Sequence, residues 1–278
     1  MSEEIRNKNN ELRTEMIIDS NRSICIGKSS VIGQRSEQQD AIMTDEDFSY
    51  IDKGAAIAVL CDGMGGLNGG AKASQLCVST FMREFNSALK NDKDIPRFYK
   101  KAIALADADI ADLRDDNGKL LNAGSTLVSV VVSDNNLYWA SVGDSHIYVI
   151  RNDEILCITK EHNYFMILKE MVNRGELTAE EAKRDPRREA LISYMGMGGV
   201  RHIDANSKPF QLIDGDYIVL CSDGLYRSVS DEEIRNVVCI SCENTQLAAE
   251  RLTDLAISKG KRNQDNTSAV VIYYQDVG

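Results

Sequence analysis

The stretch Ala55-Ala56-Ile57-Ala58-Val59-Leu60-Cys61-Asp62-Gly63-Met64-Gly65-Gly66 decides how this chain folds. An apolar run ends abruptly in one carboxylate, and glycines follow. A run this short without a polar face predicts a strand buried on both sides. Asp62 then stands where a buried strand emerges, and a carboxylate there needs a positive partner. Gly63 lets the backbone approach a ligand closely, so we expect that partner to be a hard cation.

The chain repeats this pattern at later positions. The apolar strand predicted at residues 217–221 also ends in Asp-Gly, at Asp223. Asp265 precedes a last predicted strand, and Arg35 and Asp40 lie before the first Asp-Gly strand. Carboxylates that are far apart in the sequence but close to strand ends predict one oxygen-lined metal site. For Asp62 or Asp223 taken singly, the alternative is that Asp-Gly only marks a turn.

The donor atoms indicate which metal to expect. Carboxylates and a backbone carbonyl are oxygen ligands, which suit Mg²⁺ or Mn²⁺. Zinc fits poorly, because the three histidines, His146, His162 and His202, show no ligand spacing with one another. The Arg35 guanidinium can grip a phosphate bidentately, or it can simply pair with a neighbouring acid such as Asp40.

Composition narrows the class of protein. The 278 residues carry a formal net charge of −11, which argues against broad nucleic-acid binding and against an anionic membrane surface. No apolar run approaches the roughly 20 residues of a membrane-spanning helix. The first ten residues lack a signal-peptide core, so we expect a cytoplasmic protein.

Cysteine usage agrees with that expectation. The chain has seven cysteines, an odd number, and several of them lie in apolar patterns. Free thiols in a reducing compartment fit this distribution best. Cys239 and Cys242 form a lone Cys-x-x-Cys pair with no second pair of ligands, which disfavours a zinc or redox site.

The order of the predicted elements indicates the fold class. We expect a polar, loosely attached tail over residues 1–22 and a single domain over 23–278. The predicted elements are strands, two helices (71–89 and 96–118), an antiparallel meander (125–159), a hairpin (210–221), two helices (231–238 and 245–259) and a last strand. Two antiparallel sheets covered by helix pairs would bury every apolar face. The expected fold is therefore α+β, a four-layer αββα sandwich.

Residues 160–207 differ from their surroundings, because they are polar, helix-rich and interrupted. Thr178 and Glu181 have the spacing of a capping box at a helix start. Residues 195–199 form a glycine segment that we expect to be flexible. An insertion of this kind predicts a surface subdomain or lid.

A nucleotide-binding loop is the main alternative for the glycines after Asp62. The dinucleotide fingerprint would need a glycine at position 68, which is Asn68. No Lys-Ser or Lys-Thr follows as a Walker loop requires. The parallel sheet of such folds also conflicts with the predicted meander.

Over about residues 23 to 275 the sequence resembles the metal-dependent protein serine/threonine phosphatases of type 2C, the PPM family, and especially its compact bacterial members. The matching motifs are Gly33-x-Arg35-x4-Asp40, Asp62-Gly63-Met64-Gly65-Gly66, Gly124-Ser125-Thr126, Gly143-Asp144-Ser145, Ser222-Asp223-Gly224-Leu225 and Asp265-Asn266. The resemblance implies an αββα sandwich with a two-metal centre of Mn²⁺ or Mg²⁺ at one end.

The resemblance also implies roles for individual residues. Asp62 bridges the two metals, and Asp223 and Asp265 hold the first. The Gly63 carbonyl and, through water, Asp40 serve the second metal.

Three further roles follow from the same resemblance. Asp144 corresponds to a residue tied to a third, weaker metal. Arg35 binds the substrate phosphate. Residues 160–207 correspond to the family's flap, which lies beside the site and affects substrate choice.

Two residues depart from the family pattern. Gln39 stands where many members have glutamate, which removes a charge near the second metal. Met64 stands where animal members have a histidine proposed as general acid, so leaving-group protonation falls to water.

The implied activity is hydrolysis of phosphoserine and phosphothreonine in proteins by a metal-activated water, without a covalent intermediate. The expected partners are phosphoproteins that a serine/threonine kinase modifies, and the expected state is a monomer. Two alternatives stay open. One is a narrow phosphatase of a single regulatory phosphoprotein, such as an anti-anti-sigma factor. The other is a pseudophosphatase that only binds.

Overall fold

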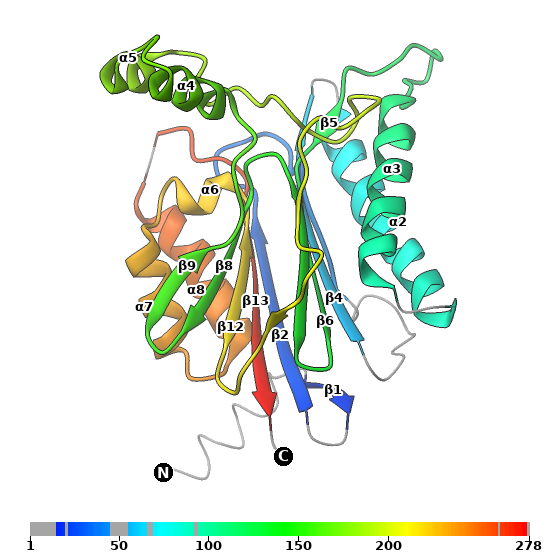
Figure 1. Cartoon of the computed structure of the whole chain (residues 1–278), viewed down its shortest axis with the longest axis vertical. Coiled ribbons are helices and arrows are strands. Elements are labelled where there is room, and N and C mark those ends of the chain that lie inside the picture. The colour runs from blue at the N-terminus through cyan, green and yellow to red at the C-terminus, as the bar shows by residue number, and fades with distance from the viewer. Residues whose placement is uncertain are drawn as a thin grey trace.

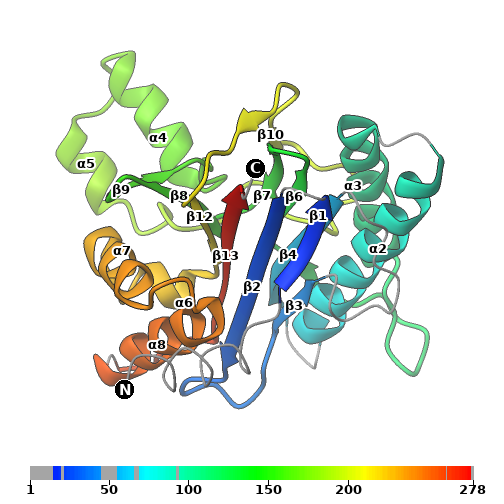
Figure 2. The same ribbon diagram turned by 90° about the horizontal axis from the view of Figure 1, so that it is seen from below.

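Two antiparallel sheets stack face to face, and helices cover the outer face of each (Figures 1 and 2). The computed structural model describes residues 15–19, 22–44, 55–65, 69–91, 94–260 and 262–276. The predicted α+β sandwich of four layers is confirmed. Within these ranges every helix is too short or too polar to cross a membrane.

Strands that lie far apart in the sequence are neighbours in both sheets. In order across the first sheet lie β1 (Glu15–Asp19), β2 (Arg22–Val31), β13 (Thr267–Asp276), β12 (Tyr217–Cys221), β8 (His146–Arg151) and β9 (Glu154–Cys157). Across the second lie β10 (Asp204–Ala205), β7 (Asn136–Val142), β6 (Leu127–Ser133), β4 (Ala55–Met64) and β3 (Asp40–Thr44). Two short strands join the second sheet: β5 (Gly124–Ser125) pairs with β4, and β11 (Phe210–Gln211) pairs with β7.

Strand β4 is buried on both faces, as its sequence predicts. Ile57 and Val59 pack under α2 (Gly69–Asn91) and α3 (Ile95–Ala111). Leu60, on the other face, packs between the sheets with residues of β8 and β13. The first sheet is covered in the same way by α7 (Asp231–Ile240) and α8 (Thr245–Ser258).

The predicted meander over residues 125–159 is wrong in one respect. Strands β6 and β7 belong to the second sheet, whereas β8 and β9 belong to the first. The chain crosses between the sheets at residues 143–145, where Gly143 has a φ of +101° that favours glycine. The turn is short, but it joins two layers of the sandwich and not two neighbouring strands.

The predicted hairpin over residues 210–221 is also wrong. Strand β11 pairs with β7 in the second sheet, and β12 pairs with β8 and β13 in the first. The Asp216 carboxylate accepts a hydrogen bond from the backbone N–H of Ile213 at 2.8 Å, and Gly215 has a φ of +88°. This turn therefore carries the chain from one sheet to the other.

The helix predicted to end at residues 117–118 ends earlier, at Ala111. The Asp115 carboxylate accepts hydrogen bonds from the backbone N–H groups of Asn117 and Lys119, both at 2.9 Å. Such side-chain bonds offer the backbone an alternative to the helix. The helices predicted near residues 231–238 and 245–259 are confirmed as α7 and α8.

The segment predicted as a tail contains a strand. Strand β1 pairs antiparallel with β2 at the edge of the first sheet, so residues 15–19 are attached to the domain. Residues 1–14 of the predicted tail, and Gly66 of the opening stretch, lie outside the described residues.

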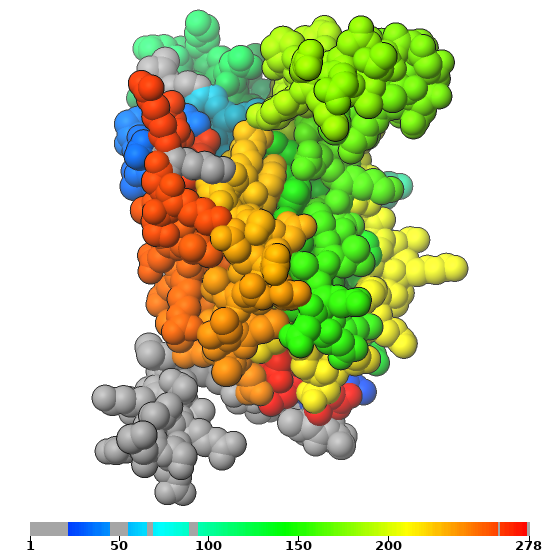
Figure 3. Space-filling view, turned by 90° about the vertical axis from the view of Figure 1, so that its left-hand side faces the viewer, coloured from blue at the N-terminus to red at the C-terminus, as the bar shows by residue number. Residues whose placement is uncertain are grey.

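Residues 160–207, called the flap segment from here on, carry α4 (Tyr164–Asn173) and α5 (Ala179–Arg184). The predicted capping box at Thr178 is confirmed. The glycine segment predicted to be flexible is held at both ends. Met195 and Ser125 exchange both backbone hydrogen bonds, and the Asp107 carboxylate accepts from the N–H groups of residues 196 and 199 at 2.7 and 2.6 Å. Figure 3 shows the flap segment as a lobe beyond the end of the helical face.

Candidate metal centre

Five aspartates from both sheets gather at one end of the sandwich. Asp40 and Asp62 are directly opposed across β3 and β4. Asp223 begins α6 (Asp223–Tyr226) immediately after β12, and Asp265 lies just before β13, the strand that pairs with β12. Asp144 lies in the link between the sheets. This is the end at which α6 and the flap segment lie (Figure 1).

The sheets are joined at this point by a buried hydrogen bond. The Ser222 hydroxyl, which follows β12, donates to the Asp40 carboxylate of β3 at 2.8 Å. The pKa of Asp62 is raised by its burial, and the negative charges of the other four aspartates raise it further. The structure thus brings together all the aspartates that the sequence singles out.

Thr126, which has no role in the sequence analysis, fixes the backbone of Asp62. Its hydroxyl accepts from the Asp62 N–H at 2.9 Å, and its own N–H donates to the Asp62 carbonyl at 2.8 Å. The same hydroxyl lies 2.8 Å from that of Ser145, next to Asp144. Thr126 therefore links two of the carboxylate-bearing segments. The motif Gly124-Ser125-Thr126 was the available signal, but nothing local indicates these contacts.

The glycines of the two Asp-Gly units are required for close packing and not for a turn. A Cβ on Gly63 would lie 2.1 Å from the Gly70 carbonyl oxygen, and one on Gly224 would lie 2.0 Å from that of Asn266. Neither glycine has a positive φ. The interpretation of Asp-Gly as a mere turn signal is therefore wrong at both positions.

Burial and like charge make this cluster costly without a cation. Burial raises the pKa of Asp40 to about 6, and the same cause raises that of Asp144 to about 6. Burial also raises the pKa of Asp223, although Arg227 opposes the rise. One buried oxygen of Asp40 and one of Asp223, Oδ1 in each, have no hydrogen-bond partner. These unpartnered acceptors are oxygen donors suited to Mg²⁺ or Mn²⁺.

Two arginines contact the carboxylates in the structure. Arg35 forms an ion pair with Asp265 at the exposed rim, and Arg227 contacts Asp144 and Asp223 at 3.3 and 3.2 Å. No three His, Cys, Asp or Glu side chains in the described ranges form a finished ligand set. The cluster fits a cation in its charge and donor chemistry.

Asn266 positions the loop that carries Arg35. Its side-chain amide donates to the carbonyls of Ile32 and Glu37 at 2.9 and 3.0 Å and accepts from the Gln39 N–H at 2.8 Å. The Gln39 side chain in turn donates to the Gly65 carbonyl at 3.2 Å. The loop is thereby fixed against the aspartate cluster.

The contacts of the histidines and cysteines indicate structural roles. His146 bonds Glu161 at 3.0 Å and Tyr148 at 2.9 Å, and the Gly143 N–H donates to His162 at 3.2 Å. Burial lowers the pKa of His162 to about 4. All seven cysteines are free, including Cys239 and Cys242.

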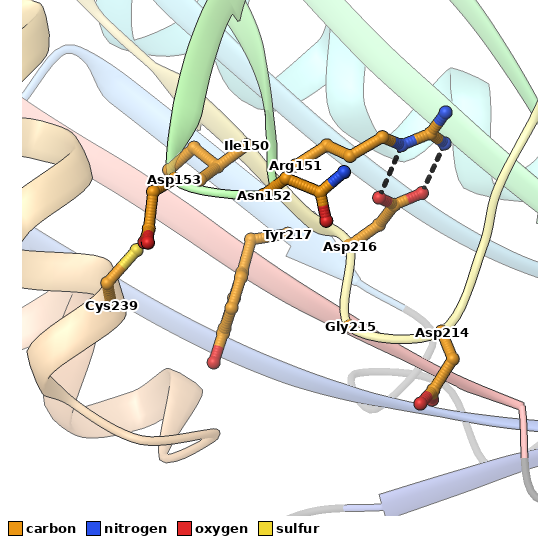
Figure 4. A pocket seen from close by; sticks show the side chains of 9 residues that line it. All are labelled: Ile150, Arg151, Asn152, Asp153, Asp214, Gly215, Asp216, Tyr217 and Cys239. Atoms are coloured by element: carbon orange, nitrogen blue, oxygen red, sulfur yellow. Dashed lines mark hydrogen bonds and ion pairs between the residues drawn. The ribbon is translucent and has the colours of Figure 1, made fainter.

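A cavity of about 250 Å³ lies at the other end of β12, away from the aspartate cluster (Figure 4). Asp216 and Arg151 both line it and contact each other, since the guanidinium donates twice to the carboxylate, at 2.8 and 2.6 Å. The Asp216 carboxylate is only 1% exposed. We interpret this pair as structural, because it closes the ends of β8 and β12.

Arg151→Met should lower the free energy of unfolding by about 3 kcal/mol, because it leaves a buried carboxylate without its counter-charge. Denaturant unfolding measures the change, and the Mn²⁺ dependence of activity should stay the same. The matched control is Arg174→Met, whose partner Glu176 is exposed, and it should change stability by less than about 1 kcal/mol. Equal stability changes in the two variants would contradict the structural interpretation.

Comparison with known proteins gives a consistent answer. The family model "Protein phosphatase 2C" matches residues 28–256. A serine/threonine phosphatase, stp, of Listeria innocua is 27% identical over 220 residues, which cover 78% of this chain and 83% of the relative. The protein phosphatase PhpP of Streptococcus pneumoniae is 28% identical over 210 residues, covering 74% and 81%.

Solved structures agree in fold. A serine/threonine phosphatase of S. agalactiae superposes with a TM-score of 0.76 at 28% identity, covering 90% of this chain and 99% of the other. The catalytic domain of the phosphatase PstP, solved in complex with two manganese ions, gives 0.71 at 27% identity, covering 92% and 100%. The family match spans most of the sequence and includes four of the five clustered aspartates, so the chain belongs to the protein phosphatase 2C family.

Proposed function

We propose that this protein serine/threonine phosphatase hydrolyses phosphoserine and phosphothreonine in proteins at a centre of two Mn²⁺ or Mg²⁺ ions. The observation that carries the proposal is the gathering of five aspartates from both sheets, with buried carboxylate oxygens of Asp40 and Asp223 left unpartnered. Metal dependence is a property of the family. The number and identity of the ions in this chain are part of the proposal.

The proposed ligand roles are those that the family resemblance implies, and the arrangement of the strands is compatible with them. Asp62 lies directly opposite Asp40 and its backbone is fixed by Thr126, so it suits the shared ligand that the resemblance implies. Asp223 and Asp265 come from the paired strands of the other sheet and would hold the first ion. The Gly63 carbonyl and, through water, Asp40 would serve the second.

Asp144 would serve a weaker third ion only if that ion displaced the Arg227 guanidinium, which contacts this carboxylate at 3.3 Å. When bound, such ions would supply the positive charge that lowers the pKa of a water molecule and makes it nucleophilic.

Arg35 is the proposed phosphate-binding residue. Its side chain lies at the exposed rim, and its loop is fixed by Asn266. A guanidinium in this position can bind two phosphoryl oxygens and stabilise the charge that they carry in the transition state. Met64 has no proton to give, so a water molecule would protonate the leaving hydroxyl.

Several finer points belong to the same proposal. The substrates are phosphoproteins modified by a serine/threonine kinase, and the enzyme is a cytoplasmic monomer that binds neither nucleic acid nor membranes. The net charge of −11 supports the absence of nucleic-acid and membrane binding. The seven free thiols support a cytoplasmic location. We further propose that residues 23–278, together with strand β1, form one domain in which the flap segment is a subdomain that influences substrate choice.

The test is turnover of phosphoserine and phosphothreonine peptides with Mn²⁺ and after chelation. We expect phosphate release with Mn²⁺, none after chelation, and none from the Asp223→Ala variant. Asp185→Ala, which removes a flap carboxylate paired with Arg187, is the matched control and should keep its activity. Mn²⁺ binding without turnover of any phosphopeptide would favour the pseudophosphatase, and turnover of one phosphoprotein in a panel would favour the narrow phosphatase.

The stabilising effect of Mn²⁺ should depend on pH. Burial raises the pKa of Asp40 and that of Asp144 from 3.8 to about 6, so the folded chain binds more protons than the unfolded chain between these values. These two groups therefore lower the stability of the metal-free protein as the pH rises through that window. A cation binds the ionised form, so Mn²⁺ should raise Tm more at about pH 7.5 than at about pH 5. Thermal unfolding measures this difference, and an equal gain at both pH values would contradict it.

A further inference from the structure

Arg227 contacts three carboxylates that come from three separate segments of the chain. Its guanidinium lies 3.2 Å from Asp223 on α6, 3.3 Å from Asp144 in the link between the sheets, and 3.3 Å from Glu189 in the flap segment. Its own backbone caps the C-terminal end of α6, so the side chain starts from a fixed position. Neither the motifs nor the proposed reaction assigns it a role.

Two of these carboxylates are buried parts of the aspartate cluster. The side chain of Asp144 is 8% exposed and that of Asp223 is 14% exposed. Asp223 repels Asp144, Asp265 repels Asp223, and Arg227 offsets the repulsion at both. One carboxylate oxygen of Asp223, Oδ1, still lacks a hydrogen-bond partner, so the guanidinium compensates only part of the negative charge there. Arg227 thus lies where an additional cation would otherwise find ligands.

The third carboxylate belongs to a firmly held part of the flap segment. The residues on either side of Glu189 use their carbonyls to accept hydrogen bonds from the first turn of α4, with distances of 2.8 Å from the Tyr164 N–H and 2.9 Å from the Phe165 N–H. A displacement of Glu189 would therefore move the start of α4 with it. The ion pair with Arg227 links that structure to α6, and so to the metal centre.

We propose that Arg227 is a positioning residue that supplies the protein's own cation between Asp144 and Asp223 and, through Glu189, fastens the flap segment to the metal centre. A divalent ion between Asp144 and Asp223 must compete with a tethered guanidinium. The wild-type chain should therefore bind one ion fewer than a chain without this positive charge. This inference rests on the proposed function only in taking the aspartate cluster to be a metal centre. The number of bound ions and the attachment of the flap segment can both be measured without substrate.

Three substitutions separate the two roles. Arg227→Met removes the charge and the link to the flap segment. Arg227→Lys keeps the charge but cannot contact three carboxylates at once, because an ammonium is a compact point charge. Glu189→Gln keeps the Arg227 charge but weakens its contact with the flap segment, and it also weakens the ion pair of Glu189 with Arg188. Arg174→Met, which removes an exposed arginine of the flap segment, is the control.

Two measurements without substrate test the proposal. The first is the number of Mn²⁺ ions bound per chain at saturation, by equilibrium dialysis. The second is amide hydrogen exchange over residues 185–195 in the metal-free protein. We expect Arg227→Met to bind one Mn²⁺ more than wild type and to exchange roughly two- to fivefold faster, as the loss of a partly exposed ion pair predicts. Arg227→Lys and Glu189→Gln should exchange faster while their Mn²⁺ count stays at the wild-type value.

The proposal is overturned if Arg227→Met leaves either quantity at the wild-type value, or if Arg174→Met changes them equally. Should Arg227→Met fail to fold, unchanged exchange in both Arg227→Lys and Glu189→Gln overturns it as well. A chain that meets both expectations but hydrolyses no phosphopeptide contradicts the proposed function and leaves the role of Arg227 intact.

Discussion

Asp62→Asn should lower kcat for phosphopeptide hydrolysis by about a thousandfold or more. The proposed shared ligand would hold both ions, so its loss would remove several kcal/mol of charge stabilisation from the transition state. The amide has the shape of the carboxylate, so the contacts of β4 with Thr126 and Asp40 should persist. The metal-free variant should also melt at a higher temperature than metal-free wild type, because burial and four neighbouring carboxylates disfavour the charge at this position. Steady-state kinetics and thermal unfolding measure the two effects.

The opposite signs of these two effects make the prediction specific. A substitution that merely damaged the fold would lower activity and stability together. Asp185→Asn, in the flap segment, removes one negative charge at a partly buried carboxyl outside the aspartate cluster and serves as the control for net charge. Undiminished turnover in Asp62→Asn would remove Asp62 from the catalytic centre.

Arg35→Met should lower kcat/KM for phosphopeptides by about a hundred- to a thousandfold, the usual effect of removing one donor to a developing anionic charge. Its ion pair with Asp265 is lost at the same time, which leaves that carboxylate more available to a metal. Mn²⁺ affinity should therefore be retained or increased while turnover falls. Calorimetric titration with Mn²⁺ and steady-state kinetics separate the two.

The flap segment offers a matched control for that variant. Arg187→Met breaks another arginine–aspartate pair, with Asp185 at 2.8 Å, in which the arginine is exposed. It should leave kcat/KM for a short phosphopeptide within about twofold of wild type, since surface pairs of this kind contribute little. If Arg35→Met behaves like Arg187→Met, then Arg35 does not bind the phosphate.

The parts of the fold that follow from local pattern could be predicted from the sequence. The run before Asp62 is apolar at every position, and β4 is indeed buried between helices and the opposite sheet. The capping box at Thr178 and the apolar faces of α7 and α8 depend on residues three or four apart, which lie close together in any helix. Asp40, Asp62, Asp223 and Asp265 could be identified because each lies next to a predicted strand, whereas Asp144 is indicated only by the family resemblance.

The parts that depend on remote contacts could not be predicted in this way. Nothing in residues 143–145 indicates that this turn joins two sheets and not two neighbouring strands. Strand β11 is only two residues long, and its partner β7 lies about 70 residues earlier in the chain. Arg227 follows Asp223 by four residues, so the sequence alone suggests an ordinary pair along one helix. Its contacts with Asp144 and Glu189 exist only because three segments meet.

Anomalous diffraction from crystals grown with Mn²⁺ tests the central claim most directly, because it locates the ions without reference to activity. We expect Mn²⁺ peaks at the end of the sandwich where α6 lies, with the Asp62 carboxylate touching two of them and with Asp223 and Asp265 on one. Peaks found only at other sites, or an Asp62 carboxylate that touches none, would contradict it.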